Sequence, residues 1–324
     1  LIDDRVRADP EATRIFMDLL LKHGNPERGL RRMNELGVLA AFIPEFEPVV
    51  AMMQFNMYHH YTVDEHSIQC VAALAEIERG EHPEDLPLSS EIMESGVNRR
   101  VLYLAVLLHD IGKGRREDHS ILGARLARRI AARFGFPQDD IDTVEWLVRN
   151  HLLMSDVAQK RDIADPRTLR DFAKAVKTRR RLDMLLVLTV CDIRGVGPGV
   201  WNGWKAQLLR TLYYETEPVL TGGFSEVNRA QRIAVAQAEF RRAFTEWPEV
   251  ELNAYIGRHY PAYWLKVELP RKIRQARFIR ASEQAGHKLA INVGFDEIRA
   301  GGGEAHGFAS DARKEEEVAA LVEG

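Results

Sequence analysis

Apolar residues recur every three to four positions along most of the chain, which is the period of an amphipathic α-helix. The segment 64–80 is typical, with Ile68, Val71, Leu74 and Ile77 on one stripe. The segment 101–108 is apolar almost all round, as expected of a helix buried on every side. The pattern therefore predicts an all-α fold.

Start and stop signals set the bounds of these helices. Asp9-Pro10 supplies an N-cap followed by proline at the first helical position, and Gly24 closes the same element. Helices are predicted at 10–23, 26–36, 64–80, 101–108, 118–134, 139–150, 166–177, 182–194, 201–216 and 226–247. Residues 41–61 are predicted to be an irregular packed connection, and 89–98 a surface excursion. One strand is predicted at 287–298, and the basic run from Lys266 to Arg280 is predicted to be a solvated face, with an anionic partner surface as the alternative.

Length and composition narrow the class of protein. A chain of 324 residues favours two compact units, and its formal charge of −3 argues against a nucleic-acid binder. No apolar run approaches the roughly 20 residues that span a bilayer, and the N-terminus does not resemble a signal peptide. It also lacks an initiator Met, so we expect a piece of a longer, cytoplasmic protein. Cys70 and Cys191 lie in apolar helical patterns and are predicted to be buried, with a disulfide between them left open.

The pair His109-Asp110 is the strongest candidate for chemistry. It ends the wholly apolar segment 101–108, where two glycines, Gly112 and Gly114, then force a turn. A carboxylate buried at this point is costly unless a cation or strong hydrogen bonds offset it. The context therefore predicts a metal ligand pair.

Further histidines and a carboxylate lie on or at the ends of neighbouring predicted helices. They are His66, His119, His151 and Asp192. Helices that contribute one or two ligands each can converge on a metal centre inside a bundle. We expect His66, His109, Asp110 and Asp192 to form one site, and His119 and His151 to complete a second, with Asp110 bridging. Imidazole and carboxylate suit Mn or Mg, with Fe and Zn as alternatives, and one or two ions are expected. Two such ions activate water for in-line attack on phosphorus.

The sequence around these residues is more distinctive than the His-Asp pair itself. The pair is shared by the whole HD phosphohydrolase superfamily. The segments Tyr58-His59-His60-Tyr61-Thr62-Val63-Asp64-Glu65-His66 and Leu107-Leu108-His109-Asp110-Ile111-Gly112-Lys113-Gly114 resemble the HD domain of bacterial bifunctional uridylyltransferase/uridylyl-removing enzymes. Tyr260-Pro261-Ala262-Tyr263-Trp264 is similar as well. The resemblance covers about residues 1–300.

This resemblance implies an HD-domain helical bundle with additional helical segments at both ends. We expect an N-terminal helical subdomain at 1–60, the HD phosphohydrolase core at 61–197, a helical region at 198–300 and a linker-like tail at 301–324. It implies hydrolysis of the uridylylated PII signal protein, releasing UMP and a free tyrosine. The transferase domain and the glutamine-sensing ACT domains of that family have no counterpart here, so uridylylation is not expected.

Two roles remain to be assigned near the pair. Asp110 and Lys113 are the predicted catalytic residues, because a lysine three positions after Asp110 can meet developing negative charge. Arg115, Arg116 and His60 are the predicted substrate contacts. Two alternatives stay open: another HD-type nucleotide phosphohydrolase, or a catalytically silent helical binding module.

Overall fold

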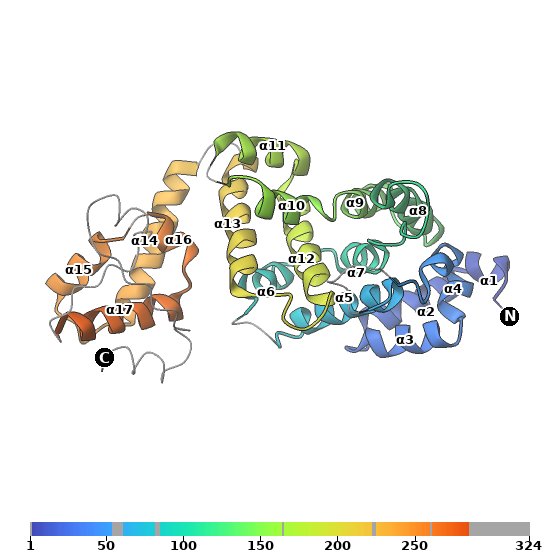
Figure 1. The fold of residues 1–324 in the computed structure, drawn as a ribbon, viewed down its shortest axis with the longest axis horizontal. Coiled ribbons are helices and arrows are strands. Elements are labelled where there is room, and N and C mark those ends of the chain that lie inside the picture. The colour runs from blue at the N-terminus through green and yellow to red at the C-terminus, as the bar shows by residue number, and fades with distance from the viewer. Residues whose placement is uncertain are drawn as a thin grey trace. The chain divides into compact units, whose positions relative to one another are not determined.

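The computed structural model describes residues 2–53, 61–81, 85–163, 165–221, 225–259 and 261–284. The chain divides into two compact units, Leu1–Glu226 and Val227–Gly324. The elements of the first unit are α1 Asp4–Ala8, α2 Pro10–Leu21, α3 Pro26–Glu35, α4 Val38–Phe42, the 3₁₀-helix η1 Pro44–Val49, α5 Val63–Glu78, α6 Pro87–Glu94, α7 Arg99–Leu108, α8 His119–Arg133, α9 Gln138–Arg149, α10 Leu153–Lys160, α11 Pro166–Val176, α12 Arg179–Gly195 and α13 Gly203–Leu220 (Figure 1). They are followed by α14 Ser225–Arg242, α15 Glu249–Gly257, α16 Pro261–Lys266 and α17 Leu269–Gln284.

The predicted all-α class is confirmed, since every regular element in the described ranges is helical. The predicted strand at 287–298 and the tail at 301–324 lie outside those ranges. In the described part of the chain, no helix is both long and apolar enough to cross a membrane.

The prediction that 89–98 is a surface excursion is wrong for its first half. Pro87 occupies the first turn of α6, and Leu88 and Ile92 are buried one turn apart. Proline at the start of a helix and an i, i+4 apolar pair are both helix signals, but the surrounding polar residues obscured them. The short helices α1, α4 and α10 were not predicted, and η1 lies within the segment 41–61 that was predicted to be irregular. The helices α15, α16 and α17 lie within the helical region predicted at 198–300, although their bounds were not predicted.

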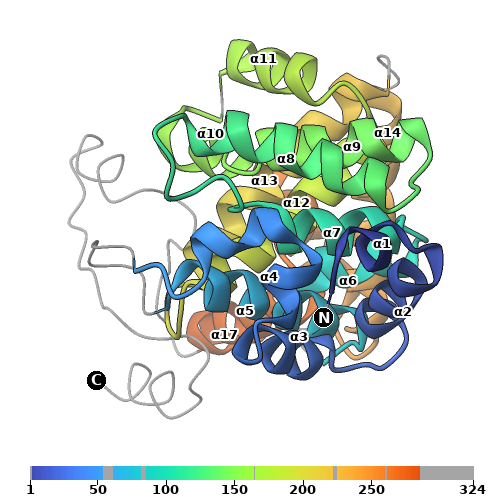
Figure 2. The ribbon, with the colours of Figure 1, turned by 90° about the vertical axis from the view of Figure 1, so that its right-hand side faces the viewer.

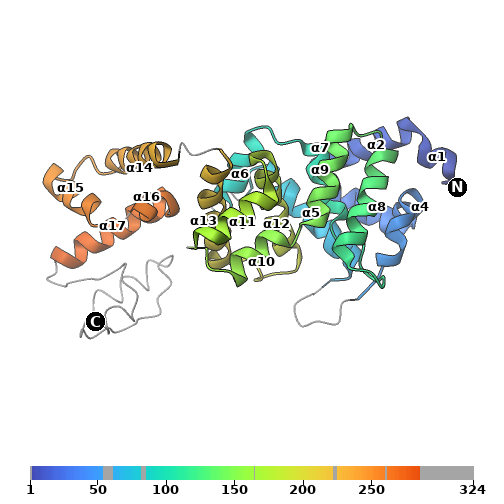
Figure 3. The same cartoon turned by 90° about the horizontal axis from the view of Figure 1, so that it is seen from above.

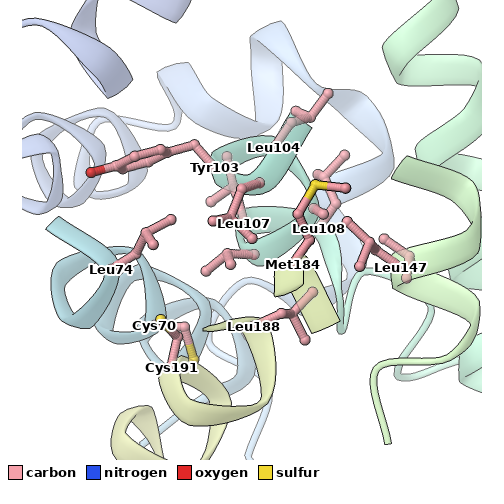
Figure 4. Packing of buried hydrophobic residues seen from close by; sticks show 14 of the residues in the cluster. Cys70, Leu74, Tyr103, Leu104, Leu107, Leu108, Leu147, Met184, Leu188 and Cys191 are labelled. Carbon is pink, nitrogen blue, oxygen red and sulfur yellow. The ribbon is translucent and has the colours of Figure 1, made fainter. Parts of the chain in front are cut away.

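The centre of the first unit is formed by α5, α7 and α12, which contact one another in all three pairings. Leu104, Leu107 and Leu108 of α7 have no exposed surface, and Figure 4 shows them packed beside Met184 of α12 and Leu147 of α9. Replacing a buried leucine by alanine costs about 2–5 kcal/mol, so this core fixes the end of α7 firmly. The helices α8 and α9 lie side by side against it (Figure 2).

An aromatic cluster connects the N-terminal helices to the same core. The ring of Phe16 lies 5.3 Å from that of Phe42 and 5.6 Å from that of Phe134, which ends α8. These centroid distances are within the range of favourable aromatic pairs. The N-terminal helices are thereby packed into the first unit.

The second unit has a separate core built from α14 to α17, which lie together in Figure 3. Trp264 is buried there, and the Phe240 ring meets it edge-on at 5.3 Å. Lys272, predicted to be on a solvated face, is instead buried and donates a hydrogen bond of 2.7 Å to the Trp264 carbonyl oxygen. Its neighbours Arg271 and Arg274 are exposed as predicted.

Candidate metal centre

The predicted pair lies where α7 ends. His109 is the C-cap residue, and the backbone turns back immediately, with Ile111 N–H donating to the Leu108 carbonyl. Both His109 and Asp110 are buried, at 1% and 2% exposure. A carboxylate and an imidazole are therefore held inside the apolar core that the sequence predicted.

The structure brings His66 of α5 and Asp192 of α12 to this pair. His66 Nε2 lies 3.2 Å from His109 Nε2 and 3.1 Å from Asp192 Oδ1. The Oδ2 atom of Asp110 is 3.4 Å from His109 Nε2 and 3.7 Å from His66 Nε2. Four donors predicted from separate parts of the sequence thus face one point.

A glycine contact sets the spacing between α5 and α12. A Cβ atom at Gly195 would lie 2.4 Å from Cys70 Sγ and 3.1 Å from the Cys70 backbone nitrogen. Only a residue without a side chain permits so close an approach. Because Gly195 is one turn beyond Asp192 and Cys70 one turn beyond His66, this contact places the two donors side by side.

The second predicted group also converges. Asp110, His119 and His151 each offer a donor atom within 4.8 Å of the others. His151 Nε2 is 3.7 Å from Asp110 Oδ1, and the His119 and His151 rings are 5.4 Å apart. Asp110 therefore directs one oxygen toward each group.

His119 reaches this position because α8 begins against the turn after Asp110. The Asp118 side chain caps the helix by accepting hydrogen bonds from the backbone N–H groups of Ser120 and Ile121. A Cβ at Gly112 would lie 2.1 Å from the His119 carbonyl oxygen and 2.7 Å from the Gly123 nitrogen. The first glycine of the predicted turn is thus required for contact between two backbones.

Backbone carbonyls fix the tautomers of two histidines. His109 Nδ1 lies 2.8 Å from the Val106 carbonyl oxygen, and His151 Nδ1 lies 2.7 Å from that of Val148. A carbonyl accepts only, so each Nδ1 carries a proton, and in the neutral imidazole each Nε2 presents its lone pair to a metal. Metal-binding histidines are commonly oriented in this way.

The electrostatics of the centre favour a cation. Burial lowers the pKa of His109, but the carboxylates of Asp110 and Asp192 outweigh it and raise that pKa to about 10. Burial raises the pKa of Asp110, yet His109 and Lys113 together hold it well below its usual range. The pKa of His151 is lowered by burial to about 4. Metal ions bind deprotonated ligands, so the buried carboxylates that attract a proton to His109 can attract a divalent ion instead.

Lys113 contacts the centre directly. Its Nζ lies 2.6 Å from Asp110 Oδ2, and 18% of its side chain is exposed. It therefore connects the buried carboxylate to the protein surface.

The predicted substrate contacts have different surroundings. Arg115 donates to the backbone carbonyls of Ile111 at 2.7 Å and Glu45 at 3.1 Å, so its guanidinium braces the turn after Asp110. Arg116 is exposed. His60 lies outside the described residues.

Cys70 was predicted only as a buried apolar residue, and the structure adds a second property. It is buried and unpaired, as is Cys191, so neither of them forms a disulfide. Its Sγ is 3.6 Å from His66 Nε2, and it belongs with His66, His109 and Asp192 to a group of donors that can hold a metal. The sequence signal for this role is that Cys70 follows His66 by one helical turn, which places both side chains on the same face of the helix.

Comparison with known proteins identifies the families that two segments of the chain match. Residues 63–192 match the HD domain family, and residues 1–42 match the family described as Uridylyltransferase GlnD third domain. Similar proteins include the bifunctional uridylyltransferase/uridylyl-removing enzymes of Rhodopseudomonas palustris (65% identical over 93% of this chain) and Bradyrhizobium sp. strain ORS 278 (64% over 92%). That of Ruegeria pomeroyi is 62% identical over 91% of the chain. The chain covers 32% of each of the first two relatives and 33% of the third.

The helical fold, the buried His-Asp pair and the matched segment define an HD-domain protein, of the class of metal-dependent phosphohydrolases. Within that class, the chain belongs to the family of bifunctional uridylyltransferase/uridylyl-removing enzymes, of which it spans about a third of the length.

Proposed function

We propose that this chain hydrolyses the phosphodiester between UMP and a tyrosine of the uridylylated PII protein. The carrying observation is the buried Asp110, which directs one oxygen toward each of two donor groups. The family name of the relatives includes uridylyl removal, and this segment of them contains the HD domain. We place the reaction in the cytoplasm.

In the proposal, His66, His109, Asp110 and Asp192 bind one divalent ion, and Asp110, His119 and His151 bind a second. Mn or Mg is preferred because carboxylates suit both, with Fe or Zn as the alternatives that imidazole favours, and a bound ion would polarise the phosphoryl group and activate water. The donor set fits them, since the backbone carbonyls engage Nδ1 of His109 and His151, whereas each Nε2 lies toward the Asp110 carboxylate.

Lys113 has a separate role in this proposal. Its ammonium lies at the partly exposed edge of the centre, 2.6 Å from Asp110. From there it can bind a non-bridging phosphate oxygen and stabilise the charge that develops on it. We assign positioning to Arg115, because its hydrogen bonds hold the turn that carries both Asp110 and Lys113. Arg116 and His60 remain the proposed contacts to the nucleotide.

The test is release of UMP from uridylylated PII in the presence of Mn or Mg. Asp110→Ala is expected to lower the rate more than about 100-fold, because both donor groups lose their shared carboxylate. Lys113→Gln should lower the rate while leaving metal stoichiometry intact. Asp156→Ala is the matched control, since that carboxylate is half-exposed and its ion pair is with Lys160.

Each alternative predicts a different result. A different HD nucleotide hydrolase would leave uridylylated PII intact but release phosphate or a nucleotide from another substrate, again dependent on Asp110. A silent binding module would do neither, and metal would bind substoichiometrically. UMP release that is unaffected by Asp110→Ala would refute the placement of the site.

A further inference from the structure

A cavity of about 470 Å³ lies between the N-terminal helices and the HD core, and none of its lining residues belongs to the metal centre. Its apolar wall includes Met17 and Leu21 of α2 and Phe134 at the end of α8. The volume is within the range of small-molecule sites, which are mostly apolar with a few polar groups.

The polar part of the wall is dominated by guanidinium groups. Arg14, Arg100 and Arg133 line the cavity, against one carboxylate, Asp18. That carboxylate is already neutralised, because it accepts hydrogen bonds from Arg14 at 2.7 Å and from Lys22 at 2.9 Å. Because Arg14 is paired with Glu11 and Arg133 with Glu45, Arg100 is the one arginine of this wall without a carboxylate partner among the described residues.

Two of the three arginines have unused hydrogen-bond donors. Arg100 stacks over the Phe136 ring at 4.7 Å and forms no hydrogen bond or ion pair with any described residue. Arg133 gives both terminal nitrogens to the Glu45 carboxylate, at 2.9 and 3.0 Å, but its Nε is buried without a hydrogen-bond partner in the described structure. The Arg100 guanidinium is therefore the group in this wall with the most donors left for a ligand.

The third arginine, Arg14, has most of its hydrogen-bond donors occupied. Arg14 donates to both oxygens of Glu11, at 2.6 and 2.7 Å, and to Asp18 at 2.7 Å. Its charge is thus balanced by two carboxylates and its fork is occupied. It lines the same cavity with little donor capacity left.

We propose that this cavity binds a small molecule that carries a carboxylate or phosphate group on a short apolar body. The oxyanion takes the planar fork of Arg100, beside the Arg133 side chain in the same wall, a geometry that guanidinium groups bind well. The apolar body packs against Met17, Leu21 and Phe134. Nothing in this proposal depends on the reaction at the metal centre.

The test is calorimetric titration of the metal-free chain with phenylphosphonate and with phenylacetate, and with benzyl alcohol as the uncharged control. Saturable 1:1 binding with a Kd of about 1 mM or tighter is expected for at least one of the anions. The tighter of the two identifies the oxyanion that the cavity prefers. Arg100→Gln should weaken binding about tenfold or more, with little change in Tm because Arg100 makes no hydrogen bond with any described residue.

Arg14→Gln removes the same charge from the same wall and should change Kd less than about twofold, since its donors are already occupied. Asp110→Ala should leave Kd unchanged, which separates the cavity from the metal centre. The absence of saturable binding at ligand concentrations up to about 10 mM would overturn the proposal, because a fragment of this size should bind more tightly than that. It is equally overturned by equal losses in the Arg14 and Arg100 variants, or by loss in the Asp110 variant.

Discussion

Replacement of Gly112 by alanine should disable one donor group and spare the other. The added Cβ would lie 2.1 Å from the His119 carbonyl oxygen, whereas non-bonded heavy atoms pack about 3.5 Å apart. The start of α8 must therefore move away by about 1 Å, and His119 moves with it. Overpacking of this kind costs about 1–3 kcal/mol, and a displacement of about 1 Å at a catalytic centre lowers rates about 100-fold.

Calorimetric titration with Mn, together with UMP release, measures both effects. We expect the group of His66, His109 and Asp192 to keep its affinity, and the group containing His119 to lose about tenfold or more. Gly123→Ala is the matched control on the opposite backbone: its Cβ would lie 3.3 Å from Val148 Cγ1, a contact that a small side-chain shift relieves. Two undiminished Mn sites in Gly112→Ala, or equal damage from Gly123→Ala, would refute the reasoning.

Two further predictions concern the other group. Gly195→Ala forces α12 away from Cys70 Sγ, so it should lower Tm and weaken the first Mn site. Adding Cys70→Ala in the same chain should restore part of the loss in Tm, and additive losses of Tm in this double-mutant cycle would contradict the contact. The pKa of His109 is raised to about 10, so the metal-free site holds a proton at neutral pH that Mn must displace. The Mn affinity should therefore rise about tenfold per pH unit between about pH 6 and 9, and titrations in buffers of different ionisation enthalpy should show release of one proton; a pH-independent Kd would contradict the assignment.

The residues of the centre were predictable because charge on an apolar helix is anomalous. His109, Asp110 and Asp192 interrupt segments that are otherwise apolar, and burying them without a partner would be costly. His66 was marked by its place at a helix start within a specific motif. Hydrophobic periodicity predicted most of the helices, and α5 and α12 are long enough for the pattern to repeat over several turns.

The distances in the centre were beyond the reach of the sequence. The contact of Gly112 with α8 depends on how two helices pack, and a glycine in a turn after a helix has an adequate local explanation without it. The bracing role of Arg115 also depends on Glu45, a residue 70 positions away. Local patterns predict which side chains are costly to bury, whereas tertiary packing decides which of them meet.

The separation of the donors along the chain has a consequence for stability. His66 and Asp192 are 126 residues apart, and the ion that they share would close that loop as a covalent cross-link does. A cross-link removes freedom from the unfolded chain, and it removes more when the loop is long. A ligand that binds only the folded state also stabilises it in proportion to the logarithm of its concentration over Kd. The metal would then act as a reversible cross-link between α5, α7 and α12, so that the free energy of unfolding of the bundle would depend on the concentration of the ion.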